Sequence, residues 1–371
     1  MNRISAFLIV RDEEAFLHDC LSSIRDEVDE IVIVDTGSVD KTRDIAARFS
    51  TKVIEMTWTG DFAKARNSAL DHATGDWILY IDADERLGVP KAGGLRQTVA
   101  DPGAVAFFVR FQPKTGYTPY DEIRLFRRDE RIRFKGCIHE TVHPDINTVR
   151  RTDGLELKRS DIAISHVGYD GDITHKHHRN LPLLEEAVKV DPGRAFLWVD
   201  MAKSLIALGR AAEAEAACEK AIALGRNHSD PKQCIDSSVG WLQLITLKRE
   251  TDPEDALCLA EEACRLYPDH KALMLARAGV RFALGEAESI LPDLLDLTSI
   301  DEETYCDPLI AYDKRIFGEW AHVLLGGVHV RMGGREKAAE CYRRAAEFAP
   351  DSQEYRVKAA AFASPQAVRS A

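Results

Sequence analysis

The stretch Gly75–Glu85, with the sequence GDWILYIDADE, constrains the fold of this chain more than any other. Its segment Trp77–Ile81 is rich in β-branched and aromatic residues, which predicts a buried strand. Asp82 and Asp84 follow where that strand must end. Residues i and i+2 of an extended segment point to the same side, so the two carboxylates are expected to converge. Because Mg²⁺ and Mn²⁺ prefer carboxylate oxygens, the pair predicts a cation site; the alternative is a solvated acidic loop.

Apolar runs alternate with helical patterns in the first part of the chain. The four runs are Ile4–Val10, Glu30–Asp35, Lys52–Met56 and Trp77–Asp82. They lack clean polar alternation, which predicts an α/β fold with a mostly parallel sheet covered on both faces. Ligands of such sheets bind beyond the carboxyl ends of the strands. Arg11, Asp35 and the Asp82–Asp84 pair fall at those ends, so one sheet edge is the predicted site.

Several classes of protein are disfavoured by motifs and charge. The turn after the first run contains neither G-x-G-x-x-G nor G-x-x-x-x-G-K-[ST], which argues against a dinucleotide-binding domain and a P-loop. A formal net charge of −12 argues against a general nucleic-acid binder. No apolar run approaches the roughly 20 residues of a membrane span. The eight cysteines include no C-x-x-C pair, and the N-terminus lacks a signal-peptide pattern, so we expect reduced thiols in the cytoplasm.

The segment from Leu87 to Tyr169 is expected to complete the sheet and close over the crevice. Its predicted strands are Ala104–Phe111, Glu122–Arg128, Ile132–Phe134 and Asp161–Tyr169. It is also dense in His, Glu and Arg, which places candidate polar residues near the predicted site.

From about Ile173 the composition becomes rich in Ala, Leu and Glu, which predicts helices. A 34-residue helix-turn-helix template places small residues at the expected positions when it starts at Ala195 or Glu319. Weaker copies begin near Ser237 and Lys271. This matches the tetratricopeptide pattern, with a generic helical bundle as the alternative. We therefore predict two domains, residues 1–172 and 173–371.

Motifs of the first domain occur in the order typical of a known family. They are Ile9–Glu14, Asp35–Thr42, Ala65–Asn67 and Gly75–Glu85. Together they resemble the family-two glycosyltransferases of GT-A fold. The later segments His139–Glu140 and Ile164–Tyr169 resemble the branch of that family with C-terminal tetratricopeptide repeats.

The resemblance implies a binding site for a nucleoside-diphosphate sugar, with a UDP-sugar expected. Asp35 would hold the nucleobase, with Arg66 near it and Val10–Arg11 packed beside the base. Asp82 would lie near the ribose.

The resemblance also implies a metal and a general base. Asp84 would bind Mn²⁺ or Mg²⁺, and His166 is a further candidate ligand whose imidazole favours manganese. Inversion by a single displacement needs a base to take the proton of the acceptor. Relatives present it in an acidic pair, and the nearest counterpart is His139–Glu140, an imperfect match. Glu140 is the candidate base, with His139 holding it or the acceptor. Asp121–Glu122 is the second candidate, and structural roles are the alternative for His139 and His166.

These residues predict a metal-dependent inverting glycosyltransferase. The expected acceptor is a saccharide, a lipid-linked group, or a peptide or protein, and the repeats would bind it or mediate self-association. A nucleotidyltransferase would need a Gly-rich basic loop where Arg11–Glu14 is acidic. The alternative outside the enzyme class is a scaffold that has lost activity and acts through its repeats.

Overall fold

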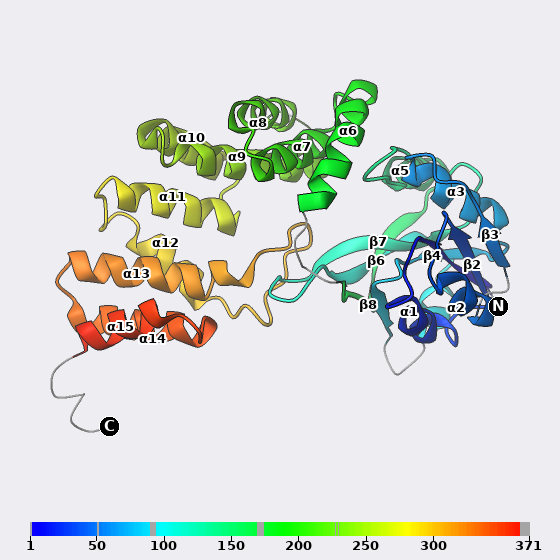
Figure 1. Ribbon diagram of the computed structural model, residues 1–371, viewed down its shortest axis with the longest axis horizontal. Coiled ribbons are helices and arrows are strands. Elements are labelled where there is room, and N and C mark those ends of the chain that lie inside the picture. The colour runs from blue at the N-terminus through cyan, green and yellow to red at the C-terminus, as the bar shows by residue number, and fades with distance from the viewer. Residues whose placement is uncertain are drawn as a thin grey trace. The chain divides into compact units, whose positions relative to one another are not determined.

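Figure 1 shows the computed structural model, which describes residues 2–49, 52–89, 94–168, 174–226, 228 and 230–363. The chain divides into two compact units. The first comprises Met1–Thr115 and Pro119–Ala187, and the second comprises Gly116–Thr118 and Val188–Ala371. The predicted domain boundary between residues 172 and 173 lies outside the described residues.

The first unit is built on an eight-stranded sheet of order β3-β2-β1-β4-β7-β6-β8-β5. Its strands are β1 (Ile4–Val10), β2 (Glu30–Asp35), β3 (Lys52–Glu55), β4 (Trp77–Tyr80), β5 (Glu85–Gly88), β6 (Ala104–Gln112), β7 (Tyr120–Arg127) and β8 (Glu156–His166). Strands β1 to β4 pair in parallel, whereas β7 joins β4 and β6 in antiparallel fashion. The sheet is therefore mixed, and its parallel part brings the carboxyl ends of β1, β2 and β4 to one edge.

Helices cover both faces of this sheet. They are α1 (Leu17–Ile24), α2 (Thr42–Phe49), α3 (Phe62–His72), α4 (Gly94–Thr98) and α5 (His143–Asp153). Helix α6 (Thr174–Val190) comes next in the chain after β8. Leu8 of β1 packs in one core cluster with Leu21 of α1, whereas the adjacent Phe7 packs in another with Leu70 of α3. Because successive strand residues point to opposite faces, burial on both faces explains the uninterrupted apolar runs.

Three local features differ from the sequence predictions. The strand predicted at Ile132–Phe134 is wrong, because these residues are irregular. Ile132 and Phe134 are nonetheless buried, since Phe134 packs edge-on against Phe7 and Tyr80. The short strand β5 and the helix α5 were not predicted. Helix α5 carries Pro144 in its first turn and ends at Gly154 in the left-handed conformation, with φ 68°.

The second unit is helical (Figure 1). Its helices are α7 (Ala195–Ala207), α8 (Ala211–Gly225), α9 (Pro231–Lys248), α10 (Pro253–Leu266), α11 (Lys271–Ala283), α12 (Leu291–Ser299), the short η1 (Lys314–Ile316), α13 (Glu319–Arg331), α14 (Arg335–Phe348) and α15 (Gln353–Phe362). Three of the four predicted repeat starts, Ala195, Lys271 and Glu319, are the first residues of α7, α11 and α13. Helix α9, however, begins before the predicted start near Ser237. The predicted class, an α/β domain followed by an all-α region, is confirmed.

Small residues make the repeat turns and helix contacts of this unit. Gly209 and Gly333 adopt φ values of 74° and 76° between the helices of their pairs, a conformation that favours glycine. Gly326 of α13 faces the ring of Tyr342 on α14, and Ala338 is fully buried. None of the helices in the described part of the chain combines the length and apolar character needed to cross a membrane.

Candidate active site

The loops that follow β1 and β2 are hydrogen-bonded into one sheet edge. The Thr36 amide and hydroxyl both donate to the Val10 carbonyl, at 2.9 and 3.1 Å. The Asp12 amide donates to Ser38 Oγ at 3.0 Å, and Asp12 Oδ1 accepts from the Val39 amide at 2.7 Å. Asp12 holds a φ of 55°, a strained conformation for a residue with a side chain. The two loops are thus fixed relative to each other.

Asp35, at the end of β2, is a buried carboxylate of which one oxygen accepts hydrogen bonds. Its Oδ1 accepts hydrogen bonds from the amides of Gly37 and Ser38 and from Arg43 Nε, each at 3.0 Å. Burial alone would raise the pKa of Asp35, but the hydrogen bonds from Ser38, Gly37 and Arg43 hold it below its usual value. Within the described residues, its buried Oδ2 has no hydrogen-bond partner. That oxygen is a buried acceptor that the described residues leave unused.

Val10 and Arg11, also predicted to bind the nucleotide, differ in exposure. Val10 is buried in the core of the sheet, whereas the side chain of Arg11 is 56% exposed and lies 3.9 Å from Asp12. The guanidinium that pairs with Asp35 is Arg43 of α2, which sequence analysis missed. Its only sequence signal is a basic residue in the first turn of the helix that follows Asp35.

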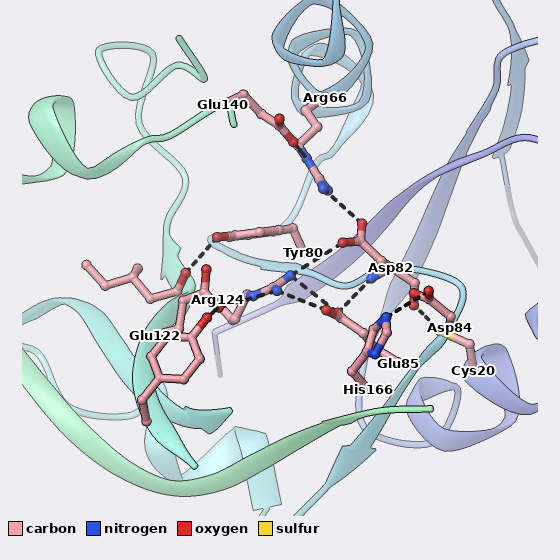
Figure 2. Close-up of polar contacts among 12 residues, drawn as sticks. Cys20, Arg66, Tyr80, Asp82, Asp84, Glu85, Glu122, Arg124, Glu140 and His166 are labelled. Atoms are coloured by element: carbon pink, nitrogen blue, oxygen red, sulfur yellow. Dashed lines mark hydrogen bonds and ion pairs between the residues drawn. The ribbon is translucent and has the colours of Figure 1, made fainter. Parts of the chain in front are cut away.

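Arg66 on α3 joins two predicted site residues. Its Nη2 donates to Asp82 Oδ1 at 2.9 Å, and its Nε donates to Glu140 Oε1 (Figure 2). The guanidinium lies over the rings of Tyr80 and Phe134, with its Cζ 5.2 and 5.7 Å from their centroids. This arrangement brings the candidate base and the candidate ribose-binding carboxylate to one cation.

Arg124 on β7 forms the second cationic centre of the site (Figure 2). Its Nη2 donates to Glu85 Oε1 at 2.9 Å, and its Nη1 lies 3.9 Å from Asp82 Oδ2. Like Arg66, it lies over the ring of Tyr80, at 4.7 Å. Burial would raise the pKa of Asp82, but the charges of Arg66 and Arg124 lower it, which keeps this carboxylate ionised.

The second candidate for the base, Asp121–Glu122, is split between two environments. Asp121 pairs with Arg159 at 2.7 Å and with Arg110 at 3.6 Å. Glu122 instead accepts from Tyr120 Oη at 3.1 Å and lies 3.5 Å from Arg124. Adjacent strand residues point to opposite faces, so only Glu122 joins the network around Asp82.

Asp84 and His166 form the candidate metal pair. Asp84 Oδ2 lies 2.9 Å from His166 Nε2, and the pairing of β5 with β8 sets Glu85 opposite His166 (Figure 2). A Cβ on Gly168 would fall 2.7 Å from Asp84 Oδ2 and 2.8 Å from His166 Nε2, so glycine keeps this space open. Over the described ranges, no group of three or more His, Cys, Asp or Glu residues is arranged to hold a metal.

Asp82 and Asp84 do not converge on one object as predicted. Strand β4 ends at Tyr80, so the two carboxylates belong to a turn and not to an extended segment. Asp82 faces Arg66 and Arg124, and Asp84 faces His166.

Glu13, in the loop after β1, extends the acidic edge. Burial and the charges of Asp84, Asp82 and Asp40 raise its pKa to about 7. Burial is the largest cause of this shift, and the three neighbouring carboxylates add to it. Glu13 belongs to the segment Arg11–Glu14, whose acidic character is evident from the sequence, but no local signal gives Glu13 itself a role.

His139 shares a backbone feature with Asp12. With φ values of 52° and 55°, they are the two non-glycine residues at positive φ in the described part of the chain. Both precede or adjoin candidate site residues, since Glu140 follows His139 directly. Strained backbone of this kind persists where surrounding contacts fix it and is often found at functional sites.

Two parts of the chain match models of known protein families. Residues 5–156 match the family model for glycosyl transferase family 2. Residues 197–228 match a tetratricopeptide repeat model. The resemblance predicted from the motifs is therefore confirmed for both parts of the chain.

Individual relatives cover parts of the chain. A TPR repeat-containing protein of Synechococcus elongatus is 41% identical over 41% of this chain and 38% of its own length. The SPbeta prophage-derived glycosyltransferase SunS of Bacillus subtilis is 27% identical over 64% of this chain and 57% of its own. The solved mannosyltransferase PcManGT of Pyrobaculum calidifontis aligns at 18% identity and a TM-score of 0.41, covering 80% of this chain and 86% of that one. The chain thus spans less than two thirds of the two curated relatives.

Proposed function

We propose that this chain is a metal-dependent inverting glycosyltransferase that uses a nucleoside-diphosphate sugar as donor. The match of residues 5–156 to glycosyl transferase family 2 supports the reaction class. The observation that carries the proposal is the pair Asp84–His166. Their side chains lie 2.9 Å apart, and Gly168 leaves the space beside them free of a Cβ. The alternative is an inactive scaffold acting through its helical repeats, supported by the relative that is named for such repeats.

The nucleobase is proposed to bind at Asp35. An ionised carboxylate only accepts hydrogen bonds, so its buried Oδ2 selects a base that presents an N–H group. Uracil, thymine and guanine present a ring N–H group, whereas cytosine presents an acceptor at the equivalent ring position and donates only from its exocyclic amino group. We therefore expect uridine-, thymidine- or guanosine-diphosphate sugars to be preferred over cytidine-linked ones, with UDP-sugars as the first candidate.

The diphosphate is proposed to bind with a divalent cation. Asp82, Asp84 and Glu13 make this edge acidic, so a diphosphate would be repelled without added positive charge. Asp84 and His166 lie 2.9 Å apart and offer a carboxylate oxygen and an imidazole nitrogen, two donor types that such cations accept. These residues would hold Mn²⁺ or Mg²⁺, which stabilises charge on the leaving diphosphate as a Lewis acid. The imidazole favours manganese.

Glu140 is the proposed general base. The acceptor nucleophile attacks the anomeric carbon, the bond to the diphosphate breaks, and the proton of the nucleophile passes to the Glu140 carboxylate. A single displacement of this kind inverts the anomeric centre. The proposed acceptor is a saccharide, a lipid-linked group, or a peptide or protein, with the helical repeats binding it or mediating self-association. A cytoplasmic location is proposed because all eight cysteines are free thiols.

A thermal-shift panel tests the donor site. Unfolding would be measured with UDP-, dTDP-, GDP- and CDP-sugars, each with and without Mn²⁺, because a ligand at 100 times its dissociation constant stabilises by about 2.7 kcal/mol. A metal-dependent shift with one N–H-bearing base would support the proposal and name the nucleotide. The same panel on Asp35→Asn is the matched control. No shift with any donor would favour the scaffold.

A further inference from the structure

Two carboxylates with different proposed roles share one guanidinium. Arg66 Nη2 donates to Asp82 Oδ1 at 2.9 Å, and Arg66 Nε donates to Glu140 Oε1. Asp82 follows β4, at the proposed donor side, whereas Glu140 lies in the irregular segment before α5 and is the proposed base. The guanidinium is a rigid plane, so a shift of one carboxylate can change the hydrogen bond of the other without direct contact between them.

The surroundings of Arg66 restrict how it can move. Its side chain is 8% exposed and lies over the Tyr80 and Phe134 rings. The Tyr80 ring is itself fixed, because its hydroxyl donates to the Ile123 carbonyl at 2.8 Å. A displacement of the guanidinium toward either carboxylate therefore changes its bond to the other.

The two carboxylates differ in how firmly the remaining structure holds them. Asp82 also lies 3.9 Å from Arg124, and its amide donates to Glu85 Oε2 at 2.8 Å. Glu140 follows the strained residue His139, and its side chain is 10% exposed. The orientation of Glu140 therefore depends on Arg66, and that of Arg66 depends on Asp82.

We propose that Arg66 is a positioning residue that orients the base Glu140 through its bond to Asp82, so that the donor side of the site sets the geometry of the base. This inference rests on the proposed function, and it gives Arg66 a role other than contact with the nucleobase. One further donor of Arg66, the buried Nη1, has no hydrogen-bond partner in the part of the chain that the structure describes. The guanidinium at Asp82 is thus the same one that holds the proposed base.

A kinetic double-mutant cycle tests the proposal. The variants are Arg66→Lys, Glu140→Gln and the double variant, with kcat and the donor KM measured for transfer. If Arg66 acts through Glu140, Arg66→Lys lowers kcat by about 10²-fold in the wild type but by less than about threefold in Glu140→Gln, since the base is already lost. The donor KM stays within about threefold of its starting value in both backgrounds, because the loss is in the chemical step.

Arg43→Lys is the control for this cycle. Arg43→Lys alters the guanidinium at Asp35, outside this bridge, so its effect is expected to be the same in both backgrounds. Equal losses for Arg66→Lys in both backgrounds, or a loss confined to the donor KM, would overturn the positioning role.

An unfolding cycle separates this proposal from the proposed function. The thermal midpoints of Asp82→Asn, Glu140→Gln and their double variant are compared in the wild-type and Arg66→Lys backgrounds. The bridge predicts non-additive shifts in the first background and additive shifts in the second. If no sugar nucleotide supports transfer, the proposed function fails while this cycle still reports on the bridge. Additive shifts in the wild-type background would overturn the bridge itself.

Discussion

Asp84 Oδ2 lies 2.9 Å from His166 Nε2, although 82 residues separate them in the chain. The antiparallel pairing of β5 with β8 produces this contact, because Glu85 and His166 are register partners and Asp84 precedes Glu85. The Val167 amide also donates to the Asp84 carbonyl at 2.8 Å, which fixes the backbone on both sides. The last strand of the sheet thus supplies the second proposed ligand of the metal.

Replacing Asp84 tests the proposed metal site. Asp84→Ala is expected to abolish transfer and the metal-dependent shift with a nucleotide, while the fold persists because the side chain is partly exposed. Activity assays and thermal shifts with Mn²⁺ would measure this, with Asp26→Ala as control, since that carboxylate is 88% exposed. Normal turnover in Asp84→Ala would refute the assignment.

Gly168 allows a subtler test of the same site. A Cβ at this position would lie 2.7 Å from Asp84 Oδ2 and 2.8 Å from His166 Nε2, so Gly168→Ala must displace one of them. We expect a loss of metal affinity of at least tenfold, since precise ligand placement governs such sites. Titration of the variant with Mn²⁺, followed by thermal unfolding, measures it. Gly116→Ala is the control, because Gly116 also lies in a loop and a Cβ there would have no atom within 4 Å. The φ of 81° at Gly116 adds backbone strain to this control. Unchanged affinity in Gly168→Ala would argue against a metal between these side chains.

The role of Glu140 as base is tested by removing its charge. Glu140→Gln keeps an oxygen that can accept from Arg66, so donor binding should persist. Transfer should fall by about 10²–10⁴-fold, the range for loss of a general base. Glu122→Gln, at the second candidate, is the comparison. If Glu122→Gln shows the larger loss, the base is Glu122.

Glu13 gives a prediction about stability and pH. Its pKa is raised to about 7 in the folded protein by burial and by Asp84, Asp82 and Asp40, from an ordinary value of 4.5. The folded state therefore keeps a proton that the unfolded state loses as the pH rises through 4.5, and folding becomes less favourable until about pH 7. Glu13→Gln removes this penalty, so its melting temperature should exceed that of the wild type at pH 8 and approach it near pH 4.5.

The matched control for Glu13 is Glu130→Gln, at an exposed position of the same unit. Melting curves of the three proteins between pH 4.5 and pH 8 provide the measurement. A difference between Glu13→Gln and the wild type that does not grow with pH would contradict the raised pKa.

Two glycines of the helical unit should respond oppositely to alanine. On Gly326 of α13, a Cβ would lie 3.0 Å from the Tyr342 ring, so Gly326→Ala should destabilise the protein by about 1–3 kcal/mol through overpacking. On Gly279 of α11, a Cβ meets nothing within 4 Å, and Gly279→Ala should stabilise by about 0.4–1 kcal/mol through the unfolded chain. Chemical denaturation of both variants measures the difference. Stabilisation by Gly326→Ala would show that α13 and α14 can separate freely.

Elements whose signals are local could be predicted from the sequence. The apolar runs of β1, β2 and β4 mark strands buried on both faces, and the repeat glycines mark turns between helices. The position of Asp35 and the Asp82–Asp84 pair at one edge could also be predicted, because parallel strands end on the same side.

Which side chains meet at that edge depends on the tertiary fold. Arg43 and not Arg66 pairs with Asp35, while Arg66 bridges Asp82 to Glu140. The buried Glu85 and Arg124 form a further ion pair, which no local sequence pattern predicts. Such pairings depend on strand register and on the path of irregular segments, which join residues far apart in the chain. Periodicity reports only which face a residue occupies, so it places these groups near the site without choosing their partners.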